Sequence, residues 1–197
     1  MSKCIKSLSC FIILSFFIVG CGNNSSDSKK PADATYGVKS GIVTFENIFG
    51  MKGKNVVFYF DDYGKKEAYV MTDEDGSGVR IKVDSVVTEY STLVKKGKKT
   101  ISHASLLGVD LQKYLPNLEE IEEKEFLGKK CKGYKYTVKT TGTNADNWFW
   151  EGILLYSETF MDSRSRSGGI VMEASKLEVN VRIPADKFQV PPDISIQ

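Results

Sequence analysis

The sequence has few of the residues that enzymes commonly use at catalytic centres. Its 197 residues include one histidine, His103, and no Gly-x-Ser-x-Gly segment accompanies it. Nucleophilic catalysis needs a base that a third group positions. Histidine- and cysteine-rich spacings of the kind that bind metals are also missing. These absences argue against a hydrolase, and we expect a non-enzymatic protein without catalytic residues, metal or cofactor.

Beyond the first 20 residues the sequence has few cysteines and no net charge. Cys4 and Cys10 lie within that stretch, Cys21 follows it, and only Cys131 occurs later. We expect Cys131 to be a buried strand thiol, and the neighbouring lysines leave a reactive thiol as the alternative. The whole sequence has 27 basic and 25 acidic residues, and removal of Lys3 and Lys6 with the first 20 residues leaves 25 of each. A neutral chain argues against a nucleic-acid partner.

What the sequence does contain is an export signal. Lys3 and Lys6 precede an apolar run from Leu8 to Val19, which is too short to span a bilayer as a mature helix. The run ends in Ile18-Val19-Gly20-Cys21, which resembles the lipobox of bacterial lipoproteins. The resemblance implies that residues 1–20 are removed and that acyl chains on Cys21 anchor the protein in a membrane. An ordinary signal peptide that happens to contain a cysteine is the alternative.

Residues 21–35 combine the lipidated cysteine with a flexible tether. Gly22 to Ala34 include no apolar residue larger than alanine, so they cannot build a core. Because glycine rather than aspartate follows Cys21, the resemblance to enterobacterial lipoproteins implies a lipid-anchored protein of the cell envelope, in the outer membrane and facing the periplasm. Residues 36–197 are long enough for one domain with a sizeable core.

The pattern of that domain predicts mostly strands. β-branched and aromatic residues alternate, and tight turns favour antiparallel neighbours. About ten strands are expected, including 36–49, 54–61, 65–72, 80–84, 86–94, 132–140, 148–159 and 170–183. Leucines at helical spacing predict a short helix near 109–114, which ends before Pro116. Segment 119–126 fits either a helical turn or an edge strand. About ten antiparallel strands with one or two separate helices make the predicted class α+β.

Residues 73–84 superficially resemble a calcium loop. Oxygen-bearing residues occupy positions 1, 3, 5 and 12 of the pattern and glycine occupies position 6, namely Asp73, Asp75, Ser77, Asp84 and Gly78. Arg80, however, stands at the normally apolar eighth position, and the flanks have strand patterns rather than helical ones. An acidic turn is the preferred interpretation, with calcium binding as the alternative.

Several segments resemble the lipoprotein-carrier superfamily of LolA- and LolB-like proteins. They are Leu127–Lys135, Trp148–Leu155, Ile183–Pro191, and Gly41–Phe45 together with Tyr59–Gly64. The resemblance covers most of residues 36–192. It implies a curved antiparallel half-barrel with one or two helices over its open side and an apolar cavity that holds acyl chains. The lipobox makes the chain more similar to the anchored receptor than to the soluble carrier.

Two groups of apolar side chains are candidate contact sites. One face of strand 148–156 would line a cavity for a lipid or acyl chain, through Trp148, Trp150, Leu154 and Tyr156. A hairpin tip with Phe49 and Met51 would contact the membrane or a protein partner. Ordinary core packing is the alternative for both groups. The sequence therefore predicts an envelope lipoprotein that binds a hydrophobic ligand, or else a non-enzymatic interaction module of an envelope protein complex.

Overall fold

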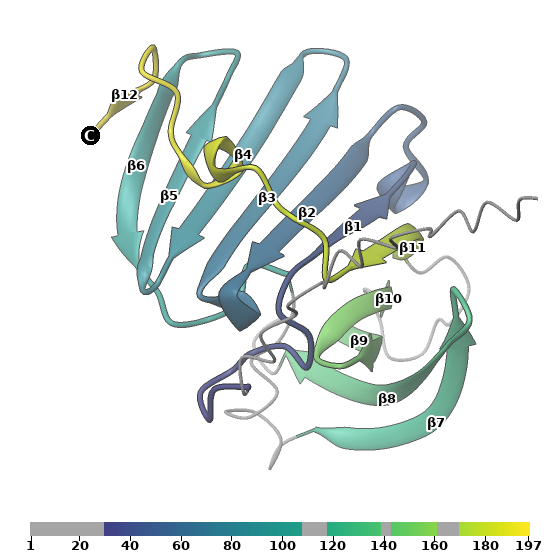
Figure 1. The fold of residues 1–197 in the computed structure, drawn as a ribbon. Helices are drawn as coiled ribbons and strands as arrows, with labels where there is room; N and C mark the ends of the chain where they lie inside the picture. The colour runs from purple at the N-terminus through teal and green to yellow at the C-terminus, as the bar shows by residue number, and fades with distance from the viewer. Residues whose placement is uncertain (1–29, 108–117, 139–142, 161–169) are drawn as a thin grey trace, which may run out of the picture.

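The computed structural model describes residues 30–107, 118–138, 143–160 and 170–197. These residues form one open sheet of 12 strands, in the order β12-β6-β5-β4-β3-β2-β1-β11-β10-β9-β8-β7 (Figure 1). All neighbouring strands are antiparallel except β12 and β6. The sheet thus consists of two meanders, which meet where β1 pairs with β11.

The strands of the first meander are β1 (Gly41–Phe45), β2 (Asn55–Asp61), β3 (Lys66–Asp73), β4 (Gly76–Val83), β5 (Val86–Ser91) and β6 (Lys96–Ile101). Those of the second are β7 (Glu119–Phe126), β8 (Lys129–Val138), β9 (Thr143–Trp150), β10 (Ile153–Phe160) and β11 (Ile170–Val179). The chain ends with β12 (Ser195–Ile196). Short 3-10 helices lie at η1 (Ile48–Gly50), η2 (Asp62–Gly64) and η4 (Ala185–Phe188).

The predicted α+β class, a half-barrel of about ten strands under one or two helices, is wrong. Among the described residues there is no α-helix, and the sheet is open and has 12 strands. Of the leucines that suggested a helix, Leu106 and Leu107 are buried in an irregular segment, so burial against the sheet explains their apolar character. The helix expected near 109–114 lies outside the described residues. No described helix is long and apolar enough to cross a membrane.

The two meanders differ in direction because β11 is bent. Its first residues, 170–173, pair with β10, and residues 174–179 pair with β1. The register shifts at Thr44 and Phe45, which leaves Ser175 as an extra residue in β11, and the Ser175 hydroxyl donates to the Thr44 carbonyl. A bulge bends a strand and increases its twist. In Figure 1, β7 and β8 accordingly curve away from the direction of β2–β5.

Each face of the first meander is crossed by a chain segment. Successive residues of a strand point to opposite faces, so Glu67 and Ala68 of β3 lie on different sides. On the Ala68 side, the C-terminal segment packs Phe188, Val190 and Ile194 against the sheet and ends as β12 beside β6 (Figure 1). On the Glu67 side, residues 102–107 follow β6 back across the sheet. The covers are therefore irregular chain and the short 3-10 helix η4, where α-helices had been expected.

Candidate functional site

The strand predicted at 148–159 is two strands, β9 and β10, because a tight turn divides it. Glu151 and Gly152 have φ of 50° and 80°, as in a type I′ hairpin turn. The register places Trp148 opposite Tyr156 and Phe149 opposite Leu154, with an irregularity between Leu154 and Tyr156. Directly opposed residues share a face. The four candidate ligand residues therefore do not form one face.

Trp148 and Leu154 belong to the buried core. The indole Nε1 of Trp148 donates to the Glu122 carbonyl at 2.9 Å, and its ring contacts Tyr156 edge-on at 5.4 Å. A side chain at position 133 would meet this indole, since a Cβ there would lie 2.7 Å from Nε1. Gly133 thus allows Trp148 to lie flat on β8. These contacts fit core packing, which was the alternative interpretation.

Trp150 lines a cavity of about 430 Å³, which we call the tether-root pocket. Its volume falls within the range typical of ligand sites. The pocket lies where the N-terminal segment meets β8, β9 and the turn between β9 and β10. An aromatic wall and basic side chains from two segments surround it, including Tyr134, Phe149, Trp150, Lys30 and Lys132.

The charge around the tether-root pocket is predominantly positive. Lys30 enters from the N-terminal segment and Lys132 from β8, while Glu151 contributes the acidic group among the lining residues. A third lining lysine, Lys130, is ion-paired with Glu123. Outside this set, the Nζ of Lys129 lies 4.8 Å above the Trp150 ring. An apolar chain with an anionic head group matches this combination of aromatic surface and positive charge.

The N-terminal segment is held in place by bonds to both meanders. The Thr35 N–H donates to the Tyr63 carbonyl at 2.9 Å, after β2, and the Gly37 N–H donates to the Glu151 carbonyl at 2.8 Å, in the β9–β10 turn. Between them, Tyr36 is buried and packs on Phe60, with ring centroids 4.6 Å apart. The pocket therefore has a fixed wall on the side where the chain from Cys21 enters.

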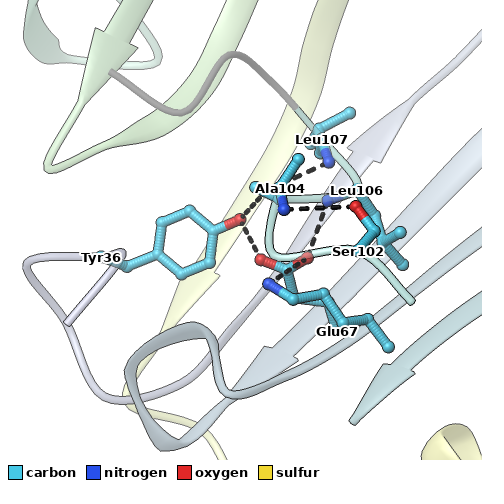
Figure 2. Close-up of polar contacts among 8 residues, drawn as sticks. Tyr36, Glu67, Ser102, Ala104, Leu106 and Leu107 are labelled. Carbon is cyan, nitrogen blue, oxygen red and sulfur yellow. Dashed lines mark hydrogen bonds and ion pairs between the residues drawn. The ribbon is translucent and has the colours of Figure 1, made fainter. Parts of the chain in front are cut away.

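Sequence reasoning missed a buried polar network behind Tyr36 (Figure 2). The Tyr36 hydroxyl donates to Glu67 Oε1 at 2.9 Å, and the Leu106 N–H donates to Glu67 Oε2 at 2.7 Å. Lys82 Nζ lies 3.6 Å from the same Oε2, and the Tyr36 hydroxyl is 2.7 Å from Ser105 Oγ. The network fixes segment 102–107 to β3. The available signal was a charged residue at an inward position in each of two neighbouring strands.

Burial dominates the protonation behaviour of this network. It raises the pKa of the Glu67 carboxyl, although the Lys82 ammonium and the N–H of Leu106 oppose the shift. Burial and the Glu67 charge together raise the pKa of Tyr36 well above its usual range, so Tyr36 remains a hydrogen-bond donor. The network supports the structure. None of Tyr36, Glu67, Lys82 and Ser105 is among the residues that line the tether-root pocket.

Phe49 and Met51 lie on the surface, with 41% and 47% of their areas exposed. Phe49 has φ of 59°, which is uncommon for a bulky residue. The preceding loop is fixed by Asn47, whose side-chain oxygen accepts from the Gly53 N–H. In a meander, the β1–β2 and β5–β6 connections lie at the same end, so the exposed Leu93 is at that end too.

Other predicted features have plainer outcomes. The buried-thiol prediction for Cys131 is confirmed, and burial raises the pKa of that thiol, contrary to a reactive one. The calcium-like residues Asp73 and Asp84 flank the eight-residue strand β4, which separates them by about 26 Å. Asp73 lies at the β3–β4 turn and Asp84 at the β4–β5 turn, at opposite ends of β4. His103 is exposed. Cys21 lies outside the described residues.

No protein-family model and no curated protein matches the chain. A solved structure of an uncharacterised conserved protein from Thermus thermophilus is similar, with a TM-score of 0.54 and 8% identity over 80% of this chain and 88% of that one. Two structures of PNGF-II give TM-scores of 0.50 and 0.52 at 12% identity. The chain spans only 30–31% of PNGF-II. These likenesses concern the fold alone, and the Lol-like resemblance stays a prediction.

Proposed function

We propose that this protein is a non-enzymatic envelope lipoprotein, anchored through Cys21 in the outer membrane and facing the periplasm, that binds an anionic amphiphile. The ligand class is a lipid or acyl chain with a carboxylate or phosphate head, held in the tether-root pocket. The observation that carries the proposal is the aromatic wall beside Lys30 and Lys132 at the point where the tether enters the fold. Trp150 is the one residue of the predicted ligand set that lines this pocket.

The physical argument has two parts. Tyr134 and Trp150 offer apolar area beside the buried Phe149, and each methylene that leaves water on binding contributes about 0.8 kcal/mol. Lys132 and Lys30 offer charge-assisted hydrogen bonds to a head group at the rim. Because the pocket lies nine residues from Cys21, it stays close to a source of lipid. A carrier or receptor role in lipid handling would follow from that position.

Binding of an acyl carboxylate to the purified full chain tests the pocket. A brominated fatty acid quenches tryptophan emission on contact, and Trp150 lines the pocket whereas Trp148 is buried. We expect Trp150→Phe to abolish most of the quenching. Lys132→Gln should weaken binding of the acid about three- to fivefold, since an exposed ion pair contributes up to about 1 kcal/mol. The corresponding brominated alcohol, which has no charge, should bind equally to the unmodified protein and to Lys132→Gln.

Lys135→Gln is the matched control, because Lys135 lies on the same strand and is ion-paired with Glu119 outside the pocket. It should leave the affinity for the acid unchanged. Unchanged affinity in Lys132→Gln, or quenching that survives in Trp150→Phe, would contradict ligand binding at this site.

A second candidate function is a non-enzymatic interaction module of an envelope protein complex. The exposed Phe49 and Met51 favour it. A photo-crosslinking amino acid in place of Phe49 should capture a protein in living cells, whereas the same group in place of Leu127, an exposed turn residue elsewhere, should not. Capture of lipid from position 49, or equal capture from both positions, would count against this second function.

A further inference from the structure

A row of three exposed aliphatic side chains and one lysine crosses the end of the first meander. Lys66 is paired with Val83, Val83 with Val86, and Val86 with Ile101. Directly opposed residues share a face, so these four side chains lie side by side on β3–β6. The exposed fractions of Val83, Val86 and Ile101 are 37%, 40% and 71%. We call these four residues the Val83 row.

The C-terminal segment covers the neighbouring part of the same face. Phe188, Val190 and Ile194 pack on the cluster of Ala68, Val79, Ile81 and Tyr90. Ala68 and Ile81 form the next cross-strand pair inward from Lys66 and Val83. The Val83 row is therefore the uncovered margin of an otherwise covered apolar face, and exposed contiguous apolar surface is typical of an interaction site.

The Val83 row lies at the end of the sheet where the tether enters. Thr35 bonds to the Tyr63 carbonyl in the β2–β3 connection, Asp84 bonds to the Lys65 carbonyl of the same connection, and Ser102 bonds to the Ser85 carbonyl. These bonds join the tether root to both turns beside the row. Two inter-strand spacings, about 10 Å, separate the β2–β3 turn from the β4–β5 turn.

We propose that the Val83 row lies against the surface of the bilayer in which Cys21 is anchored. This inference depends on the proposed lipidation of Cys21. Eight residues lie between Cys21 and Lys30, so the contour length from one to the other is at most about 30 Å, which suffices for the tether-bearing end to touch the membrane. The Phe49 and Leu93 connections then lie at the distal end, a strand length of about 26 Å farther away.

The charges around the row are compatible with a lipid head-group layer. Lys66 belongs to the row, and Lys99 lies on the same face of β6, two residues before Ile101. Both are exposed, and no ion pair among the described residues engages either of them. Glu67 follows Lys66 in the chain but is buried on the opposite face, so the exposed acidic residue next to the row is Asp84, which follows Val83. Aliphatic residues flanked by lysines are typical of surfaces that insert shallowly into an interface.

Depth-dependent quenching in vesicles tests this orientation. The full chain, lipidated at Cys21 in cells, is reconstituted in vesicles of phosphatidylethanolamine and phosphatidylglycerol. A polarity-sensitive fluorophore is attached at Ile101→Cys and, separately, at Lys98→Cys and Val94→Cys. We expect at least twofold stronger quenching by spin-labelled lipid at position 101, because Lys98 lies on the opposite face of β6 and Val94 at the distal end of the sheet.

The other outcomes overturn the inference. Equal quenching at positions 94 and 101, or none at 101, would mean that this row does not face the bilayer. Concentration-dependent dimerisation that Ile101→Glu abolishes would assign the row to a second copy of the chain. Labelled palmitate separates the two proposals: failure of Cys21 to incorporate it refutes the anchor, whereas incorporation without quenching at 101 refutes only the membrane contact.

Discussion

Glu67 and Lys82 are charged side chains enclosed in the apolar sheet, with exposed fractions of 0% and 4%. Each carboxylate oxygen of Glu67 has a hydrogen-bond donor, and Lys82 balances the charge. Removing one member of such a pair leaves an uncompensated buried charge. The pair therefore specifies where segment 102–107 attaches, and its contribution to stability depends on both partners.

Lys82→Met should destabilise the protein by about 3–5 kcal/mol at pH 8. Burial raises the pKa of Glu67 above its ordinary value of 4.5, and loss of Lys82 removes an attraction that opposes this shift. The folded-state pKa then exceeds the unfolded one by more, so the free energy of unfolding falls more steeply as pH rises through this interval. The loss should accordingly be smaller at pH 5, as urea unfolding at both pH values would measure.

Lys98→Met is the matched control, because Lys98 forms an exposed ion pair with Glu89. Exposed pairs contribute little, so its effect should stay within about 1 kcal/mol at either pH. Equal losses at pH 5 and pH 8 for Lys82→Met would show that the Glu67 carboxyl does not govern the effect.

At the scale of elements, the β9–β10 turn decides how the most apolar part of the domain is arranged. Glu151 has φ of 50°, a conformation that asparagine and aspartate adopt more readily than glutamate. The sequence Trp148–Leu155 alternates smoothly through Glu151-Gly152, so the pattern favours one long strand. Gly152 was the available signal, but glutamate in the first turn position concealed it.

Glu151→Asn should stabilise the protein by about 0.5–1 kcal/mol, since asparagine fits the positive φ at lower cost. Thermal unfolding of the full chain would measure the gain. Glu120→Asn, an exposed glutamate on the edge strand β7, is the control and should bring no gain, because asparagine is unfavourable in strands. A lower midpoint for Glu151→Asn would mean that contacts of the glutamate in the pocket outweigh the turn conformation.

At the scale of the whole molecule, local patterns predicted strands well and their assembly poorly. Strands 54–61 and 65–72 agree with β2 and β3 to within a residue, because turn-forming residues bound each run of β-branched and aromatic residues. Segment 119–126 is confirmed as an edge strand, one of the two alternatives. The pairing of β1 with β11 joins residues that lie between 129 (Phe45 to Ala174) and 138 (Gly41 to Val179) positions apart, and no local pattern encodes it.

The candidate site was predicted in the same partial way. Trp150 was named from its apolar strand, but Lys30 and Lys132 were not, because only the folded N-terminal segment brings them together. Leu154 lies opposite Phe149 rather than on the face of Trp148, since the turn at Glu151 reverses the chain, and it is buried in the core. A period-two pattern gives the face of a residue only while the strand continues.

The position of β1 has a mechanical consequence for the anchor proposed at Cys21. A pull on the proposed acyl anchor would reach the fold at Thr35 and Gly37, whose bonds divide the force between the two meanders. The first strand behind them is paired on both sides, with β2 and with β11. Extraction therefore has to shear two rows of hydrogen bonds at once instead of unzipping a free border, so the attachment point is also the part of the sheet that is hardest to peel away.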